Sequence, residues 1–337
     1  METLGISATG ATLVALSLAY AVLNGYNDSG AIVVGMIAGR TMHPRQALVW
    51  AAAAVFAGPF LFGAGVAATI ATGLVNPASV DDSVVAAAIL SSIAWGLAAS
   101  SLGMPNSASH GLVGGLVGAA MAAGGPGAVQ VAGVARVAAF LIIAPVLGLL
   151  LGLLGGEALM YWLRQTGAHP NVVNRLRRIS LALALAFALG HGANNAQKSI
   201  GLIALSLWLT GASPVVTAPV WAVAASAACL AAGVAVGGQQ VIRTINARLY
   251  QLRTMHGLVA AASSAVVILG TTLGGLPISA TQVASMAVAG AGVADRPGKV
   301  HWEVIQDILA TWIITIPCAA LLSALCYIAI AFITGAW

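Results

Sequence analysis

The residues with the strongest chemical character in this sequence lie inside apolar segments. Asp28 stands in NGYND (24–28) and Lys198 in HGANNAQKS (191–199), and each is the only charged residue deep in its segment. Burying a charge in a bilayer costs at least about 2.5 kcal/mol on insertion scales, so such residues usually face a water-filled cavity or one another. We expect both to belong to a site that handles ions. The alternative for Asp28 is the N-cap of a half-helix, which is compatible with an ion site.

Asparagines accompany both charged residues. Asn27 precedes Asp28, and Asn194 and Asn195 precede Lys198. A side-chain amide carries donors and an acceptor, so it suits an anion or a cation. Where a helix is broken, free backbone N–H groups attract anions and free carbonyls attract cations. The sequence therefore predicts that these three asparagines bind the substrate and that Asn27 and Asn194 also contact a coupling cation, unless they only form turns beside glycine.

Hydroxyl groups follow a Gly-x-Pro element in two places, GMPNSASH (103–110) and GLPISATQ (275–282). A proline can begin a helix whose first N–H groups point at a ligand. Hydroxyls combined with such amides suit a tetrahedral oxyanion, whereas the alternative is that they only pack between membrane helices. The predicted anion ligands in these elements are Ser107, Ser109, Ser279 and Thr281.

His110 has two interpretations, a proton relay or an ordinary buried histidine, and the same two apply to His191. Together with Ser107 or Ser109, His110 also raises the alternative of an intramembrane hydrolase. Ser107 and His110 have the spacing that meets on a helix, whereas Ser109 and His110 are adjacent and point about 100° apart. The sequence contains no zinc-type His-Glu-x-x-His and no Gly-x-x-x-x-Gly-Lys loop, which argues against a metalloprotease and an ATP-driven pump. We expect no enzymatic activity and no cofactor.

The elements that must position these residues are membrane helices. Only thirteen Lys and Arg and eight Asp and Glu residues occur in 337, or 6%, against roughly 25% in a soluble domain. No charge occurs between Ser83 and Ala135 or between Ser199 and Ile242, and a span needs about 20 apolar residues. Soluble enzymes, nucleic-acid-binding domains and disordered tails are excluded, and the alternation signal is too weak for an outer-membrane barrel. The sequence predicts an all-α polytopic membrane protein.

The chain repeats itself at about half its length. Three pairs of landmarks occur in the same order: Asn27 and Asn194, 167 positions apart, and Pro105 and Pro277 and then Pro145 and Pro317, each 172 apart. Such repeats are common in transporters. We predict a first membrane repeat at 1–165, a basic cytoplasmic linker at 166–178 and a second membrane repeat at 179–337.

Each repeat contains about five apolar segments, and an odd number of crossings inverts the second repeat relative to the first. The basic clusters then fall on one side and the acidic loop at 76–82 on the other, as the positive-inside bias requires. Segments 5–39 and 179–210 are longer than a span needs, so we expect broken helices near Asn27 and Asn194. Whether 104–125 and 276–295 cross fully or are re-entrant stays open.

At these motifs the chain resembles the inorganic phosphate transporter (PiT) family over essentially its whole length. The resemblance is carried by GYND (25–28), GANN (192–195), AQKS (196–199) and the paired Gly-Met-Pro and Gly-Leu-Pro elements. It implies symport of phosphate with Na⁺ or H⁺ through inverted repeats, often as a homodimer. It also implies that Asn27, Asp28, Asn194 and Asn195 bind cation and anion, with Asp28 a Na⁺ ligand if transport is sodium-coupled, and that the four hydroxyl residues bind the anion.

Two positions depart from the family pattern. Asn195 stands where the family usually has a second aspartate, and Gln282 where it usually has a second histidine. Without the carboxylate the site has one cation ligand fewer and no second acceptor for the proton of HPO₄²⁻. Sulfate has no proton to donate, so a sulfate permease of the same family remains an alternative.

The predicted function is a secondary active transporter that imports inorganic phosphate by alternating access. Lys198 is predicted to be a substrate-binding residue that biases the site or its approach towards anions. An anion channel and an intramembrane hydrolase are further alternatives. We expect a multi-pass protein of the cytoplasmic (inner) membrane, whose partners are the transported anion and the lipid bilayer, with no nucleic acid.

Overall fold

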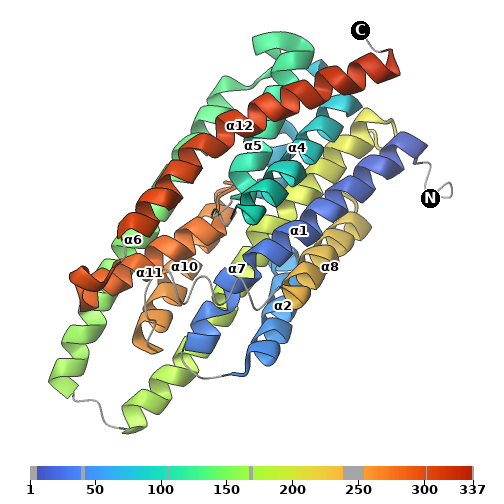
Figure 1. Cartoon of the computed structure of the whole chain (residues 1–337). Helices are drawn as coiled ribbons and strands as arrows, with labels where there is room; N and C mark the ends of the chain where they lie inside the picture. Colours follow the sequence, from blue (N-terminus) through green and yellow to red (C-terminus); the bar gives the residue numbers. More distant parts are fainter. Residues whose placement is uncertain are drawn as a thin grey trace.

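The computed structural model describes residues 6–38, 42–102, 104, 107–166, 170–237, 254–300 and 302–335 (Figure 1). Over these residues the chain is helical, apart from turns and an isolated antiparallel bridge between Val75 and Val129. The longer helices are α1 (Ala8–Ala38), α2 (Pro44–Leu61), α4 (Asp82–Ser101), α5 (Ala108–Gly124), α6 (Val131–Thr166), α7 (Pro170–Leu209), α8 (Val220–Val236), α10 (Thr254–Leu273), α11 (Ala280–Asp295) and α12 (Trp302–Thr334). Shorter elements are α3 (Gly65–Ala68), η2 (Thr69–Gly73), η3 (Pro77–Ser79), η4 (Gly125–Ala128) and η5 (Pro297–Lys299). The predicted all-α class is confirmed.

Two long helices, α1 and α7, run side by side through the middle of the molecule (Figure 1). Both are continuous, so the expectation of broken helices at Asn24–Ser29 and Gly190–Asn195 is wrong. In α7, Asn194 and Lys198 of the second motif have partners on other elements, while the backbone of the helix stays continuous. The excess length of α7 lies at its start, because residues 170–178 of the predicted linker form its first turns.

Two helical hairpins enter the bundle from opposite ends. The base of the α4–α5 hairpin is closed by backbone bonds from Asn76 N to Ala128 O and from Gln130 N to Leu74 O, each 2.9 Å. Asp81, the N-cap of α4, lies 3.5 Å from the hydroxyl of Tyr327 near the C-terminal end of α12. The base of the α10–α11 hairpin lies at the other end of α12, because only η5 separates α11 from the start of α12.

The tips of the two hairpins meet inside the bundle. The hydroxyl of Ser109, in the first turn of α5, donates to the carbonyl of Ile278, which precedes α11 (2.7 Å). Gly275 turns the second tip with a φ of 68°, a left-handed conformation that favours glycine. Because their bases are at opposite ends and their tips touch, we describe both hairpins as re-entrant.

The described residues do not confirm the expectation of two inverted repeats with about five crossings each. Among the described residues, six helices are long and apolar enough to span a membrane, or seven if α2 and the α3–η2 segment, bent by 73°, form one span. Some of these helices are hairpin arms, whose length alone does not distinguish them from full spans. Since each hairpin returns to the side from which it entered, it adds no net crossing.

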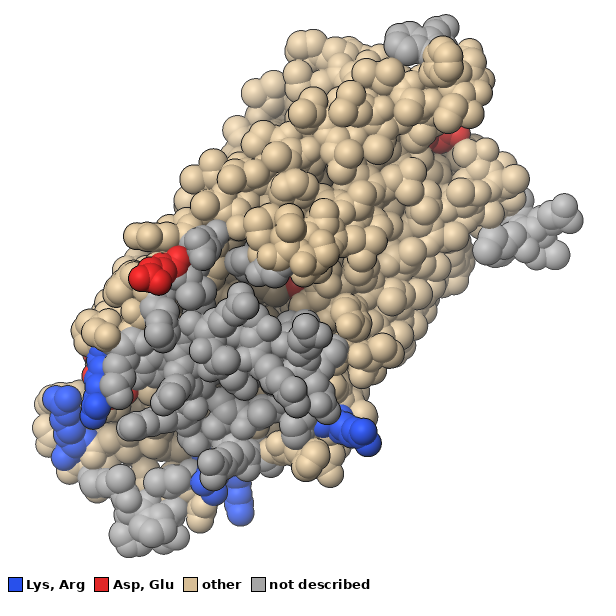
Figure 2. Space-filling model, in the orientation of Figure 1, with Lys and Arg blue, Asp and Glu red and all other residues tan. Residues whose placement is uncertain are grey.

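The outer helices α6 and α12 pack against the opposite hairpins, α6 on α11 and α12 on α5. The α5–α12 contact is close, because a Cβ placed on Gly118 would lie 2.0 Å from the carbonyl oxygen of Ala320. The outer faces of both helices expose large apolar side chains such as Ile142, Ile313 and Phe332, as lipid contact requires. On the face shown in Figure 2, Lys and Arg gather at one end of the molecule. This is the end at which α6 ends and α7 begins.

Candidate functional site

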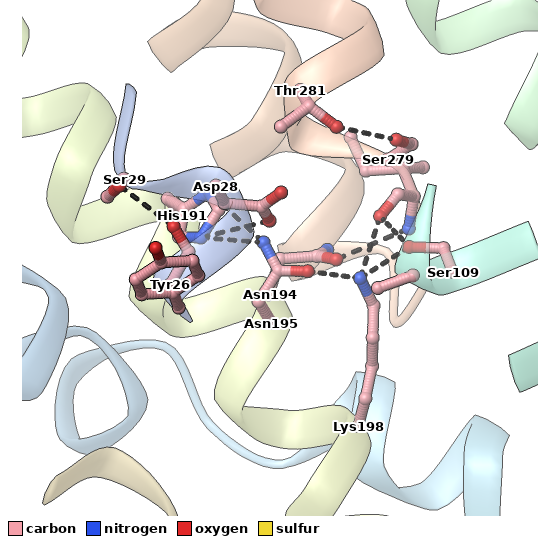
Figure 3. A network of polar contacts seen from close by, with 12 residues as sticks. Tyr26, Asp28, Ser29, Ser109, His191, Asn194, Asn195, Lys198, Ser279 and Thr281 are labelled. Carbon is pink, nitrogen blue, oxygen red and sulfur yellow. Dashed lines mark hydrogen bonds and ion pairs between the residues drawn. The ribbon is translucent and has the colours of Figure 1, made fainter. Parts of the chain in front are cut away.

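The candidate site lies where the two hairpin tips meet α1 and α7 (Figure 3). Four polar residues of α7 form a stripe on successive turns, and all are buried: His191, Asn194, Asn195 and Lys198. This spacing of three to four residues places them on one helix face. Asp28 of α1 is also buried. The structure thus brings together the two motifs that the sequence analysis selected.

Lys198 is fully buried and lies against the first hairpin tip. Its Nζ donates to Oγ of Ser109, to Oδ1 of Asn195 and, over 3.0 Å, to the carbonyl of Ile278. One cation therefore contacts both hairpin tips and its own helix. Ser109, predicted to be an anion ligand, here accepts from Lys198 and donates to Ile278.

A polar chain connects Lys198 to Asp28. The side-chain nitrogen of Asn195 lies 3.1 Å from the His191 ring nitrogens. Nε2 of His191 lies 3.5 Å from Oδ2 of Asp28. The order Asp28–His191–Asn195–Lys198 places an acidic group and a basic group at opposite ends of one buried network.

Asn194 holds the tip of the second hairpin. Its amide nitrogen donates to Oγ1 of Thr272 and to the carbonyl of Leu276, both over 3.0 Å, and its oxygen accepts from the backbone N–H of Ile278 at 3.2 Å. The residue is fully buried. Asn194 thus positions the tip, and its amide has little capacity left for a ligand.

Asn27 is the counterpart of Asn194 in the first half, and it differs from Asn194 in both burial and hydrogen bonding. It is half-buried, and its side chain makes no hydrogen bond to the described part of the chain. Its amide is free to bind a transported species. The sequence assigned Asn27 and Asn194 the same role, but the structure distinguishes them.

The first turns of α5 and α11, at the two hairpin tips, differ in how they are capped. Ser107 caps α5 by accepting from the His110 N–H at 3.3 Å, and its Oγ lies 2.7 Å from Nδ1 of His110. That same Nδ1 lies 3.3 Å from Nε2 of Gln282, so His110 links the two hairpins. At the start of α11, Ser279 makes no cap hydrogen bond, and its hydroxyl instead lies 3.2 Å from that of Thr281.

The start of α11 is consequently the part of the site best suited to an anion. The first N–H groups of a helix lack partners within it, and the helix dipole favours negative charge there. Two hydroxyls, of Ser279 and Thr281, stand beside these groups and bond only to each other. In the view of Figure 3 both lie above the network, and Ser279 is the nearer of the two to Ser109.

Sequence reasoning missed two residues that anchor the site. Tyr20 donates through its hydroxyl to the carbonyl of Ala108, which fixes the first hairpin tip to α1 (3.0 Å). Gln197 accepts from the backbone N–H groups of Val66 and Ala67 at 2.8 and 3.1 Å, where α3 begins. Gln197 belongs to the AQKS motif, and Tyr20 lies two turns before Asp28 on α1. Their positions beside the motifs were the available signal.

A monovalent cation would find oxygen ligands in this site. The Asp28 carboxylate lies in the buried network and offers oxygen ligands, whereas Asn27, its neighbour on the continuous helix α1, points about 100° away from it. Among the residues that the structure describes, no group of three or more His, Cys, Asp and Glu side chains gathers to hold a metal ion. The donor set is thus compatible with Na⁺ as transported cargo.

Comparison with known proteins places the chain in a family. A sequence profile described as the phosphate transporter family matches residues 24–323. A probable low-affinity inorganic phosphate transporter of Rhizobium meliloti (strain 1021) is 34% identical over 318 residues, covering 94% of this chain and 95% of that protein. A protein of the same description from Mycobacterium bovis is 36% identical over 326 residues, covering 96% and 78%.

The fold also matches a solved structure described as the sodium-dependent phosphate transporter. The TM-score is 0.85 at 22% identity, covering 97% of this chain and all of that one. The family profile and the relatives extend over both motifs and both hairpins. The chain is a multi-pass membrane protein and belongs to the phosphate transporter family.

Proposed function

We propose that this chain is a symporter that imports inorganic phosphate together with a cation. The observation that carries the proposal is the meeting of two re-entrant hairpin tips at a buried network that holds both Asp28 and Lys198. A carrier needs an occluded site that two movable elements can open in turn, and tips inserted from opposite ends provide such elements. The names of the sequence relatives support phosphate as the substrate.

The anion would bind at the start of α11, held by Ser279, Thr281 and the free N–H groups of the first turn. Asp28 would bind the coupling cation, and so offset the charge of the entering anion. Lys198 would add positive potential without a direct contact. Asn194, Asn195, Ser107 and Ser109 would act through the positions of the tips.

The coupling ion is Na⁺ in the first instance, because the matched solved structure is described as sodium-dependent. Proton coupling is the second candidate, with His110 as relay, since its ring lies between the hairpins. Sulfate is the alternative substrate, because Asn195 removes a carboxylate that would otherwise repel it. We place the protein in the cytoplasmic membrane with the basic end of Figure 2 inside. One chain supplies every residue of the site, so each subunit of a dimer would transport by itself.

Transport is favoured over hydrolysis. Ser107 and His110 do meet, as a nucleophile and a base would. The Ser107 hydroxyl, however, caps α5, and His110 has a glutamine rather than a carboxylate as its second partner. Gln282 contacts Nδ1, the ring nitrogen that also faces Ser107, so among the described residues no group orients the ring from its other nitrogen.

The test is uptake by proteoliposomes that contain the purified protein. Radiolabelled phosphate and sulfate are offered with an inward Na⁺ gradient, an inward proton gradient, or neither. We expect saturable phosphate accumulation above equilibrium, driven by Na⁺. Sulfate uptake that excess phosphate leaves unchanged would refute the phosphate assignment, and flux that only equilibrates would indicate a channel.

A further inference from the structure

The Lys198 ammonium is enclosed by oxygen atoms from three elements. They are Oδ1 of Asn195 on α7, Oγ of Ser109 on α5 and the carbonyl oxygen of Ile278 at the second tip (Figure 3). An ammonium has three N–H donors and no acceptor. All three donors are therefore used by the protein, and none remains to bind a transported anion directly.

This set of oxygens, which we call the lysine cage, has the composition of an alkali-cation site. Oxygen ligands coordinate Na⁺ near the middle of transporters, and unwound backbone carbonyls such as that of Ile278 are typical among them. The amide of Asn195 and the hydroxyl of Ser109 add two further neutral oxygens. The cage is also separate from the proposed anion site, since Ser279 and Thr281 make no bond to Lys198. A cation fills this cage, but it is covalently part of the chain.

We propose that Lys198 is a tethered cation, which occupies an ion site between the two hairpin tips and replaces one freely diffusing coupling ion. The role rests on the symport function proposed above. A mobile cation in the cage would enter and leave with each phosphate, whereas the ammonium stays behind. The chain would therefore carry one cation fewer per phosphate than its oxygen ligands would otherwise bind.

Two substitutions separate charge from volume. Lys198→Ala empties the cage and leaves its three oxygens, while Lys198→Met fills the same space with an uncharged chain of similar length. Arg136→Ala, at an exposed position of α6, is the control for removal of a positive charge elsewhere. The first measurement is the denaturation temperature of the purified proteins in NaCl or methylammonium chloride, against N-methylglucamine chloride at equal ionic strength.

We expect Na⁺ or methylammonium to raise the denaturation temperature of Lys198→Ala in a saturable way that Lys198→Met, Arg136→Ala and the wild type lack. This measurement needs no phosphate, so it can succeed or fail independently of the transport assignment. Equal responses of Lys198→Ala and Lys198→Met would overturn the proposal.

The second measurement is phosphate uptake at increasing Na⁺. In Lys198→Ala we expect the Hill coefficient for Na⁺ to rise by about one over the wild type, and in Lys198→Met we expect no uptake at any Na⁺ concentration. Wild-type uptake in Lys198→Ala with an unchanged Na⁺ dependence would overturn the tethered-cation role. An absence of wild-type phosphate uptake would instead refute the proposed function.

A third variant covers the case in which Lys198→Ala does not fold without added cation. Adding Asn195→Asp to Lys198→Ala places a carboxylate in the cage. Na⁺ should therefore raise the denaturation temperature of the double variant at a concentration about tenfold or more below the one that Lys198→Ala needs. Failure of the double variant to be stabilised by Na⁺ would overturn the proposal.

Discussion

Asn194 offers the sharpest test of how the site is built, because its side chain is saturated by protein contacts. Replacing it by alanine removes the bonds to Thr272, Leu276 and Ile278. At about 1 kcal/mol each, the three bonds together contribute about 3 kcal/mol, or a factor of roughly 150 in the equilibrium between the placed and displaced tip. We expect Asn194→Ala to lower the denaturation temperature by about 4 °C for a chain of this length.

The assay compares stability with the kinetics of uptake. Asn27→Ala is the matched control, since it is the same change at the equivalent position of the first half. It should raise KM for phosphate and leave the denaturation temperature unchanged, because Asn27 makes no hydrogen bond to the described residues. Asn194→Ala should lower both stability and the maximal rate of uptake.

A double-mutant cycle with Thr272→Val checks that the Asn194 effect comes from the second tip. Contacting residues typically show a coupling energy of about 0.5–3 kcal/mol, and we expect a value in that range. Additive effects, or an Asn194→Ala protein of wild-type stability with only a raised KM, would refute the positioning role. Asn194 would then be a direct ligand.

Three further outcomes follow from the same contacts. Asp28→Asn should reduce cation-driven uptake at least about tenfold, because a neutral amide cannot offset the anion's charge; wild-type coupled uptake in this variant would contradict the role of Asp28. Tyr20→Phe removes one hydrogen bond to the first hairpin tip and should cost about 1 kcal/mol in stability, measured by chemical denaturation, and an unchanged stability would count against that anchor. Gly118→Ala places a methyl group 2.0 Å from a carbonyl oxygen of α12 and should lower the denaturation temperature, whereas Gly127→Ala, with open space around it, should not.

The membrane class and the residues of the site were predictable because both depend on local composition. Uninterrupted apolar segments require a bilayer, and a buried Asp28 or Lys198 stands out when so few charges exist. The paired Gly-x-Pro elements, about 170 positions apart in the sequence, meet in the structure. The Ser109–Ile278 bond, between residues 169 apart, is such a contact.

Membrane depth was harder to predict. The arms of the hairpins have 20 and 17 residues in one case and 20 and 16 in the other, close to the length of a span. The Gly-x-Pro elements precede α5 and α11, whose N-caps are Ser107 and Ser279 rather than the prolines. Hydropathy carries no information on whether a turn lies in water or inside the protein. Only the tip contacts show that the second tip reaches Lys198.

The expectation of broken helices failed for a different reason. A cluster of asparagine and glycine raises the cost of a helix by about 1 kcal/mol or less per residue, which tertiary contacts readily offset. In α7 the amide of Asn194 satisfies the backbone of the second tip, and Gln197 satisfies that of α3. The polar side chains therefore compensate for breaks in neighbouring elements, and a pattern confined to one segment does not reveal this.

Equivalent positions in the two halves differ in how many hydrogen bonds their side chains make to the protein. The first half has Asn24, Asn27 and Asp28, and the second half, 167 positions later, has His191, Asn194 and Asn195. Every member of the second set is bonded to a neighbour, whereas Asn24 is buried without a hydrogen-bond partner among the described residues and Asn27 has none either. A carrier must release its ligands in each cycle, and a side chain with several buried protein bonds is costly to move. We therefore assign anchoring to α7 and ligand exchange to α1.

The departure of Asn195 from the family pattern fits this division. Its oxygen accepts from Lys198 while its nitrogen faces the His191 ring. An ionised carboxylate is only an acceptor and could not donate to that ring. The amide thus joins an acidic and a basic end into one network through its contacts with His191 and Lys198.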